Sequence, residues 1–340
     1  MPALIAHHIH GLSVLQTRLD APVQPGASVQ PGAPVQPGAP VQPGAPGVAI
    51  DALVPDDTTR QAFLVGCQGP DPFFFTLFDR HLVSVRRFGT RLHERDMAFN
   101  VNSMLDHIAC QPIETAGVLR AYLAGWLCHF TLDSVAHPYV YSQVQAICTA
   151  GAAGLDERDS SEVHMQMESD LDASLLYRTF GQSIATYRPM SQILLAGDTT
   201  LSQIGMMYHK IADRLGEPAH KDTTFVRAVC DMRLTYRLVY SPNGDRRALL
   251  GRIERLFRRH SQAQALSHRN ATPDVFDFDN STHQPWVNPF TGEVATDGFA
   301  ELFARAVKLG VTRLALLTNG ARGEALVGEL NFNGKPREEA

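Results

Sequence analysis

The chain has 340 residues, of which 44% are hydrophobic and 19% are charged, and its formal net charge at pH 7 is −5. This hydrophobic content excludes a disordered chain, and the acidic balance gives no indication of binding to duplex nucleic acid or to an anionic membrane surface. No run approaches the roughly 18 apolar residues of a transmembrane helix. The five cysteines form no CxxC pair, and residues 1–15 lack the basic start of a secretory signal, so we expect a cytoplasmic protein with reduced thiols.

The first predicted helix spans Ala3–Leu19, where apolar residues and histidines recur at three-to-four spacing. Four copies of a six-residue unit, VQPGA followed by Ser or Pro, then extend from Val23 to Pro46. Proline in every copy removes a backbone donor and restricts φ, so neither a helix nor a sheet continues through this segment. We interpret residues 21–47 as a disordered Pro/Gly insertion at the surface, because loops tolerate added length at a slowly growing entropic cost.

The rest of the chain is predicted as a series of helices. They are expected at Asp56–Leu64, Leu77–Phe99, Glu114–Ala136, Ser160–Tyr177, Gln192–Leu215, Thr223–Tyr240, Asp245–Gln262 and Phe299–Leu317. The third of these is expected to end before Pro138, because a residue that precedes proline is biased out of the helical region. Alternating β-branched runs are nearly absent, which indicates an all-α fold. We expect one multi-helix bundle over residues 1–340, completed by a helical extension at 181–340.

The residues that carry chemistry lie on two of these helices. His129, Asp133 and His137 follow one another four positions apart and therefore share one helix face, and His164 and Glu168 form a second pair of this kind. Imidazole and carboxylate groups are suitable ligands for Zn²⁺. The first three residues lie in an otherwise apolar stretch, residues 121–141 (AYLAGWLCHFTLDSVAHPYVY), where ionisable groups would be costly to bury without partners or a metal. The sequence therefore predicts a metal site in the core of the bundle.

The run GWLCHFTLDSVAHPYVY, with VHMQMESDLD behind it, resembles the zinc-dependent phospholipase C family, which is related to the S1/P1 nucleases. The family order is an N-terminal His, an Asp after a Gly/Pro loop, a His, HxxxD, a His and HxxxE. The resemblance covers roughly residues 1–180 and implies an all-α domain with a zinc cluster in its core. The residues of this chain that match the family order are His7, Asp71, His93, His129, Asp133, His137, His164 and Glu168.

The resemblance also implies how these ligands divide among two or three zinc ions. Asp133 bridges two ions in this arrangement. The three ligand sets would be Asp71, His93, His129 and Asp133; His137, His164 and Glu168; and His7 with Asp133.

Two of these positions have competitors in the sequence. His10 lies on the same face of the first helix as His7, and His81 precedes His93. The family places its first histidine at the start of the helix, and RLHERD is closer to its local pattern, which favours His7 and His93. Asp172, one helical turn after the HxxxE pair, is a candidate hydrogen-bond partner for a ligand histidine.

The activity that the resemblance implies is hydrolysis of a phospholipid or small phosphodiester by a metal-activated water, with Asp71 as the catalytic residue that orients or deprotonates the water. The alternatives are an S1/P1-type single-strand nuclease and a non-catalytic metal-binding helical protein. Phe73–Phe75, beside Asp71, fit either a substrate pocket or the core. The basic strings from Arg246 to Arg259 are interspersed with acids and resemble solvated helix faces more than a nucleic-acid groove.

The place of the Pro/Gly repeat between His7 and Asp71 leads to a first prediction. Because the repeat separates two ligands without containing one, deletion of Val23–Pro46 is expected to leave metal binding intact. The metal content of the purified deletion variant, measured per chain against the full-length protein, tests this. A loss of bound metal would show that the segment contributes to the site.

Overall fold

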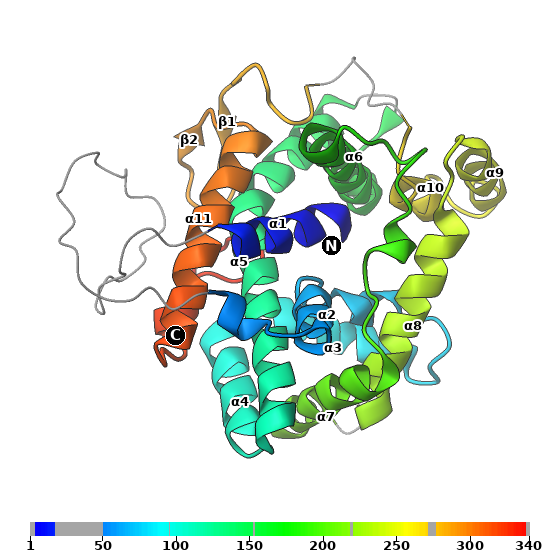
Figure 1. Cartoon of the computed structure of the whole chain (residues 1–340). Coiled ribbons are helices and arrows are strands. Elements are labelled where there is room, and N and C mark those ends of the chain that lie inside the picture. The colour runs from blue at the N-terminus through cyan, green and yellow to red at the C-terminus, as the bar shows by residue number, and fades with distance from the viewer. Residues whose placement is uncertain are drawn as a thin grey trace.

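The computed structural model describes residues 4–17, 50–94, 96–151, 154–217, 220–270 and 277–337. The predicted insertion at 21–47 lies outside these ranges. Within them the chain forms twelve α-helices and one short hairpin, in which β1 (Trp286–Val287) pairs antiparallel with β2 (Val294–Ala295). The predicted all-α class is therefore confirmed (Figure 1).

The helices follow the predicted order, with different boundaries. They are α1 (Leu4–Gln16), α2 (Asp57–Gly66), α3 (Leu82–Glu94), α4 (Met97–Ala109), α5 (Ile113–Ala150), α6 (Ser160–Phe180), α7 (Asp198–Arg214), α8 (Asp222–Val239), α9 (Asp245–Glu254), α10 (Gln262–Leu266), α11 (Phe299–Thr318) and α12 (Glu324–Val327). Short 3₁₀ segments occupy Ile50–Leu53, Asp71–Phe75, Glu157–Asp159 and Pro189–Ser191.

Two predicted helices are each divided into two by a capping side chain. The helix expected over Leu77–Phe99 is split because Asp96 accepts a hydrogen bond from the backbone N–H of Phe99 and starts α4. The helix expected over Asp245–Gln262 ends early, and the hydroxyl of Ser261 accepts from the N–H of Gln264 to start α10. Local side-chain capping therefore starts a new helix at Asp96 and at Ser261, within stretches whose pattern predicts one continuous helix.

The helix α5 is the central element of the fold. It extends for 38 residues, and α1, α2, α4, α6, α7 and α11 all contact it (Figure 1). Where α5 crosses α2, the backbones of the two helices are in direct contact. A Cβ atom on Gly125 would lie 2.0 Å from the carbonyl oxygen of Phe63, and one on Gly66 would lie 2.2 Å from that of Tyr122. Only glycine fits at both positions, so the crossing holds the loop that follows α2 against α5.

The prediction that this helix ends before Pro138 is wrong, because α5 continues to Ala150 with Pro138 inside it. Proline has no N–H to donate to the carbonyl of Ser134, one turn earlier. The residues from Ala136 to Val140 are buried, and Gly334 of the C-terminal segment packs against Ser134 and Pro138. Burial on this scale outweighs the local preference of the residue before proline.

The C-terminal helices pack against the same core. Arg313 of α11 is buried and donates to the hydroxyl of Thr131 at 2.7 Å and to the carbonyl of Val327 at 3.2 Å. Its guanidinium carbon also lies 4.6 Å from the ring centre of Phe130. These contacts stabilise the packing of α11 against α5. Among the described helices, none combines the length and apolarity that crossing a bilayer requires.

The contact between Gly334 and α5 gives a second prediction. Gly334 has φ +72°, and a Cβ there would lie 2.6 Å from the carbonyl oxygen of Ser134 and from Cγ of Pro138. Gly320 has a similar φ of +83° with open space around it. Both Gly→Ala changes cost about 1–2 kcal/mol in backbone strain, and only Gly334→Ala adds a collision. We therefore expect Gly334→Ala to lower the melting temperature more than Gly320→Ala does; equal shifts in thermal unfolding would contradict this.

Candidate metal centre

The eight predicted ligands come together around the middle of α5. This helix supplies His129, Asp133 and His137 on one face. The other five come from α1 (His7), the 3₁₀ segment after α2 (Asp71), α3 (His93) and α6 (His164 and Glu168). All are buried except His164, which is partly exposed.

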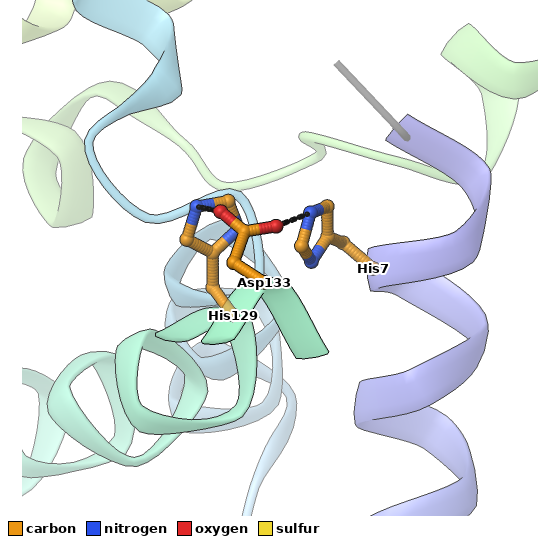
Figure 2. A group of neighbouring side chains, drawn as sticks. All are labelled: His7, His129 and Asp133. Atoms are coloured by element: carbon orange, nitrogen blue, oxygen red, sulfur yellow. Dashed lines mark ion pairs between the residues drawn. The ribbon is translucent and has the colours of Figure 1, made fainter. Parts of the chain in front are cut away.

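Asp133 lies at the centre of the cluster. Its Oδ1 is 3.0 Å from Nε2 of His7 and 3.7 Å from Nε2 of His137, and its Oδ2 is 3.3 Å from Nε2 of His129. Figure 2 shows the carboxylate between the two imidazoles of His7 and His129. Their ring centres are 4.0 Å apart. One carboxylate therefore connects imidazoles from α1 and from two turns of α5.

Two further carboxylates connect the remaining imidazoles. Oδ1 of Asp71 is 3.0 Å from Nε2 of His93 and 3.7 Å from Nε2 of His129. Oε1 of Glu168 is 3.3 Å from Nε2 of His137 and 3.1 Å from Nε2 of His164. Three groups with the spacing of metal ligands result, and they are His7, His129 and Asp133; Asp71, His93 and His129; and His137, His164 and Glu168.

The orientation of the imidazoles fits a bound cation. Nδ1 of His93, His129 and His137 lies 2.8, 3.2 and 2.8 Å from a backbone carbonyl, and since a carbonyl only accepts, Nδ1 carries the proton. In its neutral form, each ring then points the lone pair of Nε2 at a carboxylate oxygen, which also has only lone pairs to offer. A proton or a metal ion between them removes this repulsion. The donor set of imidazoles and carboxylates therefore fits zinc or a similar transition metal.

Buried atoms without hydrogen-bond partners occur at the same place. Among the described residues, Nε2 of His129, Oδ2 of Asp71 and Oδ2 of Asp133 have none. Burial raises the pKa of the Asp133 carboxyl, but the imidazoles of His137, His129 and His7 outweigh it, so its pKa is well below the usual range. Burial, followed by the effect of His7, lowers the pKa of His129 to about 3. Asp133 is thus ionised and His129 neutral, which are the forms that bind metal.

Backbone groups that the sequence analysis did not identify orient the ligands. The carbonyl of Phe332 accepts from Nδ1 of His137, and the Phe332 ring lies 4.5 Å from that of His93 and 5.3 Å from that of His129. Gly69, with φ +50°, lies so close to His129 that a Cβ would be 2.3 Å from its ring. The Gly/Pro composition of the loop marks Gly69, whereas no sequence pattern links Phe332 to a site about two hundred residues earlier.

Asp172 acts on the helix that carries His7 rather than on a ligand histidine. Its carboxylate accepts from the backbone N–H groups of Ile5 and Ala6 at 3.0 and 2.7 Å, and from Nε2 of His268 at 2.8 Å. Negative charge at the first turn of a helix satisfies unpaired N–H groups and favours the helix dipole. The expected contact with a ligand histidine is therefore replaced by a contact that positions α1.

The structure separates the competing histidines. His10 packs against Phe303 of α11, with ring centres 5.7 Å apart, and belongs to none of the three groups. Burial lowers the pKa of His10 to about 4. His81 is exposed, and its Nε2 lies 3.0 Å from Nε of Arg80. His7 and His93 are the members of each pair that lie within ligand distance of the other residues.

A pocket of about 670 Å³ opens beside the cluster. His93, His137 and His164 form part of its wall. The rest of the wall contains Phe74, Thr90, Glu94, Tyr141, Val144, Gln145, Cys148, Thr149, Glu157, Ser160, Ser161, Met165, Pro289, Phe290 and Asn333. Phe74 therefore lines the pocket, whereas Phe73 and Phe75 are buried in the core.

No protein family, curated protein or solved structure matches this chain. The function is therefore inferred from the chemistry and geometry of the centre, because a fold class by itself does not define an activity.

The different environments of His7 and His10 give a third prediction. His7→Gln removes an imidazole within 3.0 Å of Asp133, so we expect a lower metal content per chain. His10→Gln, on the same helix and equally buried, is the matched control and should keep the metal content of the parent. Elemental analysis of both purified variants measures this. Loss of metal in the His10 variant alone would reverse the assignment.

Proposed function

We propose that the protein is a zinc-dependent phosphodiester hydrolase of the phospholipase C type. The observation that carries this proposal is the linked set of three His/carboxylate groups, with His129 shared between two of them, beside an open pocket. A structural zinc site needs only four ligands and no access for substrate. Adjoining groups of this kind, two of which contribute histidines to the wall of a pocket, are instead typical of phosphoryl chemistry, in which negative charge must be stabilised on several oxygens.

The residues of the chain have distinct roles in this proposal. His7, Asp71, His93, His129, Asp133, His137, His164 and Glu168 would hold two or three zinc ions. When bound, zinc would stabilise negative charge on phosphate oxygens and make a water molecule more acidic. Asp71 would orient that water and accept its proton, since its Oδ2 has no hydrogen-bond partner among the described residues. Its Oδ1, 3.0 Å from Nε2 of His93, keeps the carboxylate in place.

The pocket favours a phospholipid or small phosphodiester over a nucleic acid. Its wall presents Phe74, Tyr141 and Phe290 together with the carboxylates of Glu94 and Glu157, and no Lys or Arg is among the described residues that line it. A polyanionic strand would require basic groups along its path. An apolar or uncharged substituent next to the phosphate is compatible with this wall. The free thiols of the five cysteines support the further proposal that the protein acts in the cytoplasm.

Metal removal and reconstitution test the proposal. We expect a chelator to abolish hydrolysis of a choline phosphodiester or of a simple aryl phosphodiester, and Zn²⁺ to restore it. Asp71→Asn should lower kcat by about 10²–10⁴-fold. Asp133→Asn should lose most of the activity together with bound metal. Asp170→Asn, a buried carboxylate on α6 that pairs with Arg269 at 3.2 Å, is the control and should stay active.

The same assay has outcomes that would reject the proposal. Hydrolysis that is insensitive to chelation, or purified protein without zinc, would exclude a zinc hydrolase. Cleavage of a single-stranded oligonucleotide in place of the small phosphodiesters would favour the nuclease.

A further inference from the structure

The helix α9 and the turn after it expose an apolar stripe. Leu249, Ile253, Leu256 and Phe257 are all exposed, with 76% of Leu256 and 84% of Phe257 accessible to solvent. Leu249 and Ile253 are four residues apart and share one side of α9, and Leu256 and Phe257 follow in the turn directly after it. Figure 1 shows α9 at the outer edge of the molecule, beside α10. Large apolar side chains grouped at such a position are typical of an interaction surface.

Arginines flank this stripe. The segment 245–259 contains six arginines and two acidic residues, although the whole chain carries a net charge of −5. Arg246 donates to the carbonyls of Arg237 and Leu238, and Arg255 donates to the side-chain oxygen of Gln264. These partners are uncharged, and neither arginine forms an ion pair with another of the described residues. The acid of this segment that lies nearest to the turn, Glu254, is directed to the hydroxyl of Ser261 and the N–H of Ala263, towards α10.

The residues that follow the stripe contact a segment next to the pocket wall. Arg259 donates to Asp156 at 2.7 Å, and Nε2 of His260 lies 3.5 Å from Asp159. The residues that directly follow these two aspartates, Glu157 and Ser160, belong to the pocket wall. The chain segment that carries the stripe is therefore linked to the segment that carries these wall residues.

We propose that α9 and the turn at 255–257 dock on the surface of an anionic lipid bilayer. Leu256 and Phe257 enter the interfacial region, and Arg246, Arg252, Arg255 and Arg258 contact anionic headgroups. This combination of exposed apolar side chains with flanking arginines is characteristic of segments that lie in the bilayer interface. This proposal differs from the expectation that these arginines belong to solvated helix faces and that the acidic chain gives no indication of binding to an anionic membrane.

The exposed apolar side chains and the flanking arginines together favour a membrane over other partners. A nucleic acid would use the arginines and leave Leu256 and Phe257 in water, because phosphates offer no apolar surface. A second copy that contacted the stripe through its own stripe, in a two-fold arrangement, would bring like charges together. An anionic bilayer satisfies both features. This inference concerns binding alone and does not depend on zinc or on hydrolysis.

Binding of the full-length protein to lipid vesicles tests the inference. We expect association with vesicles of phosphatidylcholine plus phosphatidylserine, measured by co-sedimentation, and weaker association as salt is added. Arg252→Gln/Arg255→Gln/Arg258→Gln should lower the partition coefficient by roughly a hundredfold, at about fivefold for each arginine. Leu256→Ser/Phe257→Ser should lower it by about tenfold. These residues are exposed, so the variants should keep the parent melting temperature.

A second double variant serves as the matched control. Phe78→Ser/Ile113→Ser also replaces one aromatic and one aliphatic side chain, 77% and 89% exposed, outside α9. It should bind vesicles like the parent, and so should chelated protein, which separates docking from the proposed hydrolysis. Absence of binding to the anionic vesicles, or equal effects of the two double variants, would overturn the inference. Binding to a single-stranded oligonucleotide alone, or self-association lost only in the Leu256/Phe257 variant, would do so as well.

Discussion

The contact of buried imidazoles with buried carboxylates is the constraint around which the structure is arranged. Asp133 has three imidazole nitrogens within 3.7 Å, and the ring nitrogens that face Asp71 and Glu168 come from three helices, α3, α5 and α6. Such groups are costly to bury without a cation. The surrounding elements therefore hold every ring so that Nε2 points inward. Backbone carbonyls from three separate segments accept hydrogen bonds from Nδ1 of His93, His129 and His137.

Elements distant in sequence contribute to this arrangement. Asp172 of α6 and His268, which follows α10, secure the first turn of α1 and thereby the helix that carries His7. The C-terminal segment brings the Phe332 carbonyl to His137, and Gly334 lets that segment approach the proline of α5. The region after residue 180 thus takes part in positioning the centre, although it contributes none of the eight candidate ligands.

The pocket wall and the surface of α9 carry charges of opposite sign. The described wall of the pocket carries carboxylates and no arginine, whereas α9 and the following turn carry arginines around an apolar stripe. Arg259, shortly after that turn, donates to Asp156, which directly precedes the wall residue Glu157. A phosphodiester hydrolase that acts on lipid would need both a site that accommodates uncharged substituents and a way to remain near a bilayer. The two proposals are compatible, yet each depends on different atoms.

The sequence by itself determined the all-α class and the residue types of the centre, because residues four apart share a helix face wherever the helix lies. His129, Asp133 and His137 could be grouped in this way, and so could His164 and Glu168. Only the tertiary structure decided that α5 continues through Pro138, that His7 rather than His10 faces Asp133, and that a carbonyl at Phe332 orients His137. It also decided that Leu256 and Phe257 stay exposed. Periodicity defines which residues lie on one face, whereas packing between distant segments determines which face is covered.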